Sequence, residues 1–528
     1  MDKCQWYTKP RSNTGHNQID TLDFPADILY HRLQDVLRST ALFLPEVLLS
    51  ALFIVLVLVG LIFKSKNNLS TYITLAGLAA TIPFLVEQWK YGLETETFLF
   101  NGMLRFSAMA VYFKFLFLGA AFIIVLFTSL SSFYKKASEV RYEYFLVLIA
   151  SVIGLNLVVM SSNLLMLYLS LELVSIASYI LVAIIADRKG AESGIKYFIY
   201  GIVSSALMLY GISFLYGMTG TLNLYHENFI ERLILVDGWL LLLATMLFLS
   251  GLLFKVAAFP FHIWVPDVYE GAPIPVIAWL SSAPKAAGFA VLFILIPLLN
   301  AVFGASEVVV QNWNYYVAIL AIFTIAIGNF AALKQTDVKR LLAYSSIAHA
   351  GFLLAGLSVG SELAFNSIVF YLSVYVFMNS AAFFMVEFLS GITGSTDVRN
   401  YRGLGYKIPF AGVIFVIVLI ALTGLPPTAG FTAKLLLFSS VWEGVGTDTS
   451  GIMLFLLIFG LLNTVISLYY YLKIPYLMYF RKGDNNNNET IPGVGNYAFL
   501  VIVALPVLIL FFKPDWLMNF IELLNFHL

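Results

Sequence analysis

Cysteine, histidine and charge are all scarce in this chain of 528 residues. Its single cysteine, Cys4, excludes intrachain disulfides, cysteine-held iron–sulfur clusters and cysteine-based zinc sites. The six histidines are scattered without the spacing of a metal site, and no phosphate loop, catalytic triad or nucleotide fingerprint occurs. Only 11% of residues are charged, and 30 Lys and Arg balance 30 Asp and Glu, so nothing indicates a nucleic-acid partner. We therefore expect no cofactor or redox centre in this chain.

Hydrophobic residues, by contrast, make up 60% of the chain, and the mean hydropathy is +0.88. This composition is typical of an all-α polytopic membrane protein embedded in the lipid bilayer. Residues 1–40 are predicted to be a polar N-terminal extension without a cleavable signal peptide. Within it, residues 24–37 fit an amphipathic interfacial helix and a loose tail equally well.

Apolar runs predict about 14 transmembrane helices if each needs about 20 residues. We assign three front helices to residues 41–130, a first five-helix repeat to 142–299, a second to 314–474, and a last helix to 496–512. The fourth span of each repeat contains prolines and a buried lysine, which predicts a broken helix. Because five is odd, the two repeats are expected to be inverted relative to each other, as in ion-coupled transporters.

Positive charges in the short loops predict the orientation of the chain. The richer set of alternate loops holds Lys64, Lys66, Lys135, Lys136, Arg141, Arg188, Lys189, Lys334, Lys339, Arg340, Arg399, Arg402, Lys407, Arg481 and Lys482. The opposite set holds Lys90, Arg105 and Arg232. We therefore expect the first set to be cytoplasmic and both termini to lie on the periplasmic side of a bacterial inner membrane, although the basic N-terminal tail runs against this rule.

Charged residues inside the predicted spans are the candidates for function, because a charge at bilayer depth costs about 2.5–3.5 kcal/mol. The lysines are Lys114, Lys196, Lys255, Lys285 and Lys434, and the clearest carboxylates are Glu46 and Glu172. Polar groups of this kind usually lie on ion paths in membrane proteins. The alternative for each is a static buried pair or a side chain that reaches the membrane surface.

Glu172 and Lys255 are predicted to form a pair whose opening and closing would switch the proton affinity of the lysine. Lys285 and Lys434 lie within spans and are expected to take up and release protons. Lys196 is close to the start of its span, so a surface position competes with a place in the relay. Lys114, in an outlying front helix, has the weakest claim.

Three further groups of polar or aromatic residues need an interpretation. His349 is mid-span, where a proton-transfer role and simple hydrogen-bonded packing stay open alternatives. His262, Asp267 and Glu270 lie in a turn, where they would admit protons or only shape the turn. The run Tyr469-Tyr470-Tyr471 is near a helix end and is predicted to be an interfacial anchor.

Four motifs together resemble one family closely. They are Leu171-Glu172-Leu173, the run Lys255 to Pro273, the run Val338 to His349, and the run Gly424 to Lys434. Over roughly residues 140–475 the chain resembles the antiporter-like membrane subunits of respiratory complex I, the proton-pumping NADH:quinone oxidoreductase. The N-type subunit, similar to mitochondrial subunit 2, fits best, because residue 434 is lysine where the M-type usually has glutamate and because the long lateral helix of the L-type is lacking.

This resemblance implies that Glu172 and Lys255 are the switching pair, Lys285 the central relay and Lys434 the terminal proton donor or acceptor. It also implies partners: other membrane-arm subunits, and a peripheral arm in which FMN and iron–sulfur clusters pass electrons from NADH to quinone. Two alternatives remain open. One is a Na⁺/H⁺ antiporter subunit of the same fold, and the other is a structural spacer whose polar residues only join helices.

Overall fold

The structure is a computed structural model that describes residues 26–63, 68–137, 139–305, 313–446, 450–482 and 493–524. Within these ranges, 13 helices are long and apolar enough to cross a membrane. The shorter pair α17 (Pro409–Thr423) and α18 (Ala429–Gly444) takes the place of the remaining predicted span. The predicted all-helical polytopic fold is therefore confirmed. The first part of the predicted extension, residues 1–25, and the loop with Lys64 and Lys66 lie outside the described residues.

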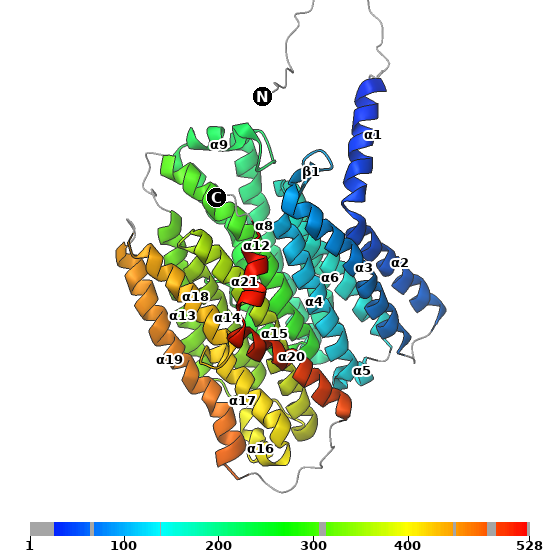
Figure 1. Cartoon of the computed structure of the whole chain (residues 1–528), viewed down its shortest axis with the longest axis vertical. Helices are drawn as coiled ribbons and strands as arrows, with labels where there is room; N and C mark the ends of the chain where they lie inside the picture. The colour runs from blue at the N-terminus through cyan, green and yellow to red at the C-terminus, as the bar shows by residue number, and fades with distance from the viewer. Residues whose placement is uncertain are drawn as a thin grey trace, which may run out of the picture.

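The N-terminal part has a helical projection and three long helices. Its elements are α1 (Ala26–Ala41), α2 (Leu44–Ile62), α3 (Leu69–Glu94), β1 (Thr97–Leu99), β2 (Leu104–Phe106) and α4 (Ala108–Leu130). The two strands form an antiparallel hairpin in which Thr97 lies opposite Phe106. Helix α1 projects from the bundle (Figure 1), so the segment left open between helix and tail is helical from Ala26 onward.

The centre of the chain forms the next group of helices. They are α5 (Ser132–Lys136), α6 (Arg141–Met160), α7 (Leu164–Ala183), α8 (Arg188–Thr219), α9 (Glu227–Ile234), α10 (Gly238–Val256), α11 (Trp264–Gly271) and α12 (Ile274–Ala305). The last group is α13 (Trp313–Leu333), α14 (Val338–Leu357), α15 (Glu362–Thr393), the 3₁₀ helix η1 (Val398–Tyr401), α16 (Leu404–Lys407), α17, α18, α19 (Ser450–Phe480), α20 (Val494–Phe512) and α21 (Asp515–Ile521). The division of these helices into two repeats with flanking helices stays a prediction.

Both predicted helix breaks are present. Helix α10 ends at Val256, and Ala257 takes the left-handed conformation with φ 61° before α11 begins at Trp264. Helix α17 ends at Thr423, and Gly424 has φ 86°. A Cβ atom on Gly424 would lie 2.4 Å from Cδ of Lys434, so glycine here permits both the turn and the close approach of that lysine.

Loops gather at the two ends of the bundle, which we call the Arg340 face and the Arg105 face. At the Arg340 face, Arg340 pairs with Asp267 and Glu270, and Asp337 bridges Asp397. At the Arg105 face, Arg105 reaches Tyr225, and Leu104 bridges Ser161. Figure 1 shows β1 and α9 at one end and α5 and α16 at the other.

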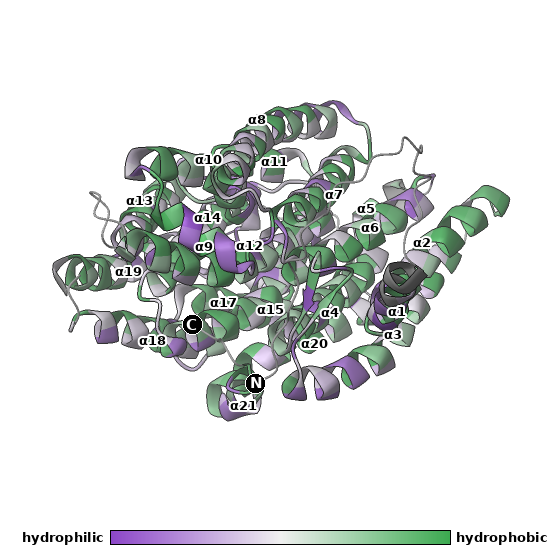
Figure 2. Cartoon of the chain, turned by 90° about the horizontal axis from the view of Figure 1, so that it is seen from above, coloured by the Kyte–Doolittle hydropathy of each residue, from purple (hydrophilic) through white to green (hydrophobic). Residues whose placement is uncertain are grey.

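Burial is deepest in two central helices. Nearly every residue of α14 and α15 is buried, whereas α2, α3, α8 and α19 each expose large hydrophobic side chains. Seen from above, the outer helices are largely hydrophobic (Figure 2). In a bilayer, such outward surfaces face lipid, and polar groups are confined to the protein interior. Helices α14 and α15 therefore form the interior in which buried charges need protein partners.

Candidate proton relay

Glu172 on α7 and Lys255 on α10 line one small cavity, as the sequence predicts for partners, but they are not in ion-pair contact. The cavity has a volume of about 20 Å³, room for about one water molecule. The half-buried Glu172 carboxylate accepts a hydrogen bond from Ser205. Nζ of the buried Lys255 has no hydrogen-bond partner among the described residues. The two side chains thus share one cavity without a direct ion pair.

Lys285 on α12 is buried and fully engaged with α14. Its Nζ donates to the carbonyl oxygen of Ser346 at 2.8 Å and to Oγ of Ser346 at 2.9 Å. One turn before it, Ser281 accepts a hydrogen bond from Asn379 of α15. Buried amines in membranes need such acceptors, and α14 supplies them here.

His349 lies one turn beyond Ser346 on the same side of α14, because residues three apart on a helix are neighbours. Its Nδ1 is 2.6 Å from the hydroxyl of Tyr371, and its Nε2 is 3.2 Å from the hydroxyl of Tyr471. The same Tyr471 hydroxyl is hydrogen-bonded to Ser345, next to the residue that holds Lys285. His349 is therefore part of a buried hydrogen-bond network, which both alternatives allow, and its role in proton transfer stays a prediction.

The prediction that all three tyrosines form an interfacial anchor is wrong, because two of them are buried. Only Tyr469 is exposed, at 67%, whereas Tyr470 and Tyr471 are buried. Tyr470 donates to Oδ1 of Asn329 at 3.0 Å. Successive residues on a helix point about 100° apart, so three tyrosines in a row cannot all face the membrane surface. The three consecutive tyrosines in the sequence were therefore enough to indicate that not all of them face the membrane surface.

Lys434 on α18 binds the interrupted end of α17. Its Nζ donates to the carbonyl oxygen of Thr423 at 2.7 Å, and the carbonyl oxygen of Leu422 is 3.4 Å away. These carbonyls are free because the helix stops, and the end of a helix is its negative pole. The ammonium also lies 4.6 Å from the ring centroid of Phe352, one turn beyond His349 on α14.

Lys196 is separate from these groups. Its side chain is 42% exposed and pairs with Glu192 at 2.9 Å and with Asp267 at 3.4 Å. Asp267 in turn accepts from Arg340, so Lys196 belongs to the charged network of the Arg340 face. This geometry agrees with the surface position that the sequence left open, and its part in a proton path stays a prediction.

An open cavity at the Arg340 face was not predicted from the sequence. It has a volume of about 210 Å³, lies beside the start of α12, and is lined by Lys339 of α14 and Glu387 of α15. Lys339 is buried and donates to the carbonyl oxygen of Ala272 at 3.0 Å. Glu387 accepts from the backbone N–H and the hydroxyl of Ser132 at 2.8 and 2.6 Å. From sequence, Lys339 counts only as one of many loop charges.

A buried ion pair joins the front helices. Lys114 on α4 lies 2.8 Å from Oε1 of Glu46 on α2, and both side chains are fully buried. Asn156 of α6 donates to Glu46 at 3.2 Å, and Lys114 donates to Gln88 of α3 at 3.3 Å. The pair therefore ties four helices together. Among the described residues, no cluster of three or more His, Cys, Asp or Glu is placed to hold a metal ion.

Comparison with known proteins gives a consistent result. The family model described as "NADH:quinone oxidoreductase/Mrp antiporter, TM" matches residues 161–467. The chain is 40% identical over 483 residues to NADH-quinone oxidoreductase subunit N 2 of Chloroherpeton thalassium, covering 89% of this chain and 92% of that protein.

Two solved structures are also similar. A chain of respiratory complex I from Thermus thermophilus superposes with a TM-score of 0.73 at 28% identity, covering 90% of this chain and 98% of that one. A chain of the Mrp complex from Dietzia superposes with a TM-score of 0.75 at 20% identity, covering 91% of this chain and 51% of that chain, which is a likeness of fold alone.

The Glu46–Lys114 pair provides a test of helix cohesion. Replacing one partner, as in Lys114→Met, leaves a buried charge unpaired and is expected to destabilise the chain by about 3–5 kcal/mol. Thermal unfolding of the purified protein in detergent measures the effect. The double variant Glu46→Gln/Lys114→Gln, which has no unpaired charge, should recover most of the loss, and the exposed Lys90→Met serves as control. Equal stability of Lys114→Met and wild type would contradict this role.

Proposed function

The chain belongs to the NADH:quinone oxidoreductase and Mrp antiporter membrane family, and from this premise we propose that it is the N-type, proton-translocating membrane subunit of an NADH:quinone oxidoreductase. The relatives named as subunit N and the likeness to complex I support this assignment. In this proposal the subunit carries no redox chemistry. NADH, FMN, iron–sulfur clusters and quinone belong to partner subunits, and other membrane-arm subunits are its neighbours.

One observation carries the proposal: α14 contacts Lys285 and Lys434 and carries His349 between these contacts, and these groups form the line proposed for the proton. Ser346 holds Lys285, Tyr471 joins Ser345 to His349, and Phe352 contacts Lys434. Hydroxyls and imidazole both donate and accept hydrogen bonds, so each can receive a proton on one side and give one on the other. The line lies in the interior of the bundle, where lipid is excluded.

In the proposed cycle, Glu172 and Lys255 act as a switch beside this line. Their small cavity leaves room for the amine to approach the carboxylate or withdraw from it. Approach favours the charged lysine, and withdrawal favours release of its proton. Conformational changes driven by electron transfer in the partner subunits would alter this distance. Lys285 passes the proton through His349 toward Lys434.

Proton entry fits the Arg340 face. The cavity beside Lys339 and Glu387 opens at the start of α12, the helix that carries Lys285. The concentration of lysine and arginine in the loops of this face supports a cytoplasmic position, with both termini on the periplasmic side of a bacterial inner membrane. The competing reading as a Na⁺/H⁺ antiporter is weaker, because the line is built of amines and imidazole, which bind protons, whereas hard cations prefer oxygen ligands.

Variants of the buried lysines test the relay. In the assembled complex, Lys285→Met and Lys434→Met should each reduce NADH-driven proton uptake into membrane vesicles by at least about tenfold, because an apolar side chain cannot carry a proton. Glu172→Ala and Lys255→Ala should lower pumping as well. The exposed Lys513→Met is the control. Wild-type pumping in all four relay variants, with the complex intact on native gels, would refute the assignment.

Tyr471 offers a milder and more specific test. Tyr471→Phe removes the hydroxyl that joins Ser345 to His349 but keeps the ring and its packing. Proton uptake per NADH oxidised should fall several-fold while assembly is retained. Tyr469→Phe removes the hydroxyl of the exposed neighbour on the same helix and should leave uptake unchanged. If both variants behave alike, the hydroxyl of Tyr471 is not on the path.

A further inference from the structure

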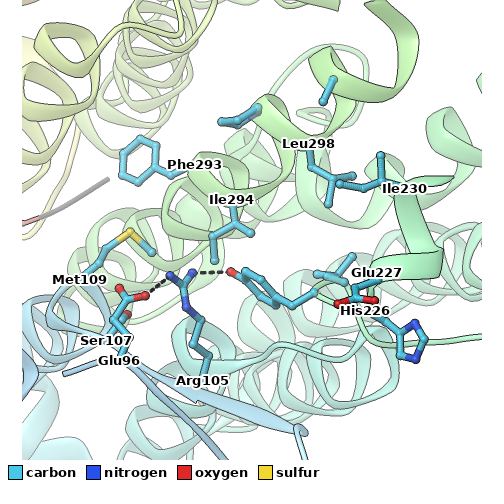
Figure 3. Close-up of a pocket in the computed structure, with 14 residues that line it drawn as sticks. Glu96, Arg105, Ser107, Met109, His226, Glu227, Ile230, Phe293, Ile294 and Leu298 are labelled. Atoms are coloured by element: carbon cyan, nitrogen blue, oxygen red, sulfur yellow. Dashed lines mark hydrogen bonds and ion pairs between the residues drawn. The ribbon is translucent and has the colours of Figure 1, made fainter. Parts of the chain in front are cut away.

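A third cavity lies at the Arg105 face, away from the proton relay. Its volume is about 540 Å³, and it is formed where the end of α12 meets α9, the start of α4 and the β1–β2 hairpin. Figure 3 shows one apolar wall, with Ile230, Phe293, Ile294 and Leu298, opposite a polar wall. Because the cavity lies at the ends of spanning helices, it is expected at the level of the lipid headgroups.

The polar wall is centred on Arg105. Its guanidinium donates to Glu96 at 2.5 Å and to the hydroxyl of Tyr225 at 2.6 Å, and Glu227 and His226 lie beyond (Figure 3). Burial raises the pKa of Tyr225, so its hydroxyl stays protonated and keeps its own hydrogen for a further acceptor. A guanidinium has five N–H donors, of which two are used in these bonds.

The net charge of the polar wall indicates which kind of headgroup it would bind. One guanidinium stands against the two carboxylates of Glu96 and Glu227, which leaves the wall with an excess of one negative charge when His226 is neutral. A purely anionic headgroup is disfavoured by this excess. A headgroup that carries both a phosphate and an ammonium satisfies both signs, since phosphate suits arginine and a primary ammonium suits carboxylates.

We propose that this cavity binds a phosphatidylethanolamine molecule of the surrounding bilayer. The phosphate lies against Arg105 and Tyr225, the ammonium donates to Glu96 and Glu227, and an acyl chain follows the apolar wall at Ile294 and Leu298. The volume falls within the range of about 300–1,000 Å³ that is usual for ligand pockets. This inference depends only on the membrane setting of the chain and stands apart from the proposed proton transfer.

The test uses the intact complex, purified in detergent and exchanged into equal amounts of dioleoyl-phosphatidylethanolamine, dioleoyl-phosphatidylcholine and dioleoyl-phosphatidylglycerol. Native mass spectrometry then counts the lipids that remain bound. The wild type should retain phosphatidylethanolamine over phosphatidylglycerol by at least about fivefold, the size expected of one interfacial charge. Glu227→Lys reverses the charge of the wall and should turn this preference toward phosphatidylglycerol.

Two further variants separate the cavity from general surface effects. Glu231→Lys makes the same charge change on α9 without lining the cavity and should leave the preference as in wild type. Ala301→Phe adds bulk to the apolar wall and should reduce lipid retention without altering NADH oxidation. Equal retention of the three lipids by the wild type, no change in Glu227→Lys, or a neighbouring subunit filling the cavity in the complex would each overturn the proposal.

Discussion

The interruption of α17 at Gly424 is the constraint on which the buried site depends. An ammonium group deep in a helical bundle requires oxygen acceptors, but a continuous helix keeps its carbonyls for itself. By stopping at Thr423, the chain exposes carbonyl oxygens that hold Lys434 at 2.7 Å, and glycine at the next position leaves room for the lysine stem. The break in the helix and the buried amine therefore require each other. Helix α10 also ends one residue after its lysine, Lys255, but Nζ of Lys255 has no hydrogen-bond partner among the described residues.

Helix α14 contacts both Lys285 and Lys434. It is almost entirely buried, and its contacts follow one another by helical turns: Ser346 meets Lys285, His349 meets two tyrosines, and the ring of Phe352 meets Lys434. A rigid helix fixes these spacings better than loops would, which matters for proton transfer over hydrogen-bond distances. The neighbouring helices α13, α15, α18 and α19 all pack against it.

Sequence patterns revealed the components better than their contacts. Prolines within apolar runs predicted both broken helices, and lysines within such runs singled out Lys255, Lys285 and Lys434. Both kinds of residue are rare in membrane spans, because unpaired backbone groups and charges cost free energy in the bilayer. Partners were harder to find. Glu46 and Lys114 are 68 residues apart in the chain, and nothing local joins them. Lys339 resembles any loop charge, although its side chain is buried beneath Ala272. Such pairings depend on the three-dimensional packing of helices, which periodicity does not specify.

The two Glu–Lys combinations have the same residue types but different geometry, which suits one to joining helices and the other to the proposed switch. Glu46 and Lys114 touch at 2.8 Å in a fully buried setting, where parting the charges is expensive, so the pair holds helices together. Glu172 and Lys255 are the same residue types, yet a cavity separates them and Ser205 already occupies the carboxylate. If the gap closed, the attraction between the carboxylate and the amine would be gained. The contact with Ser205 would be lost, and both charged groups would be desolvated. In the proposed function, two states of comparable energy would allow a distant event to shift the proton affinity of this buried amine.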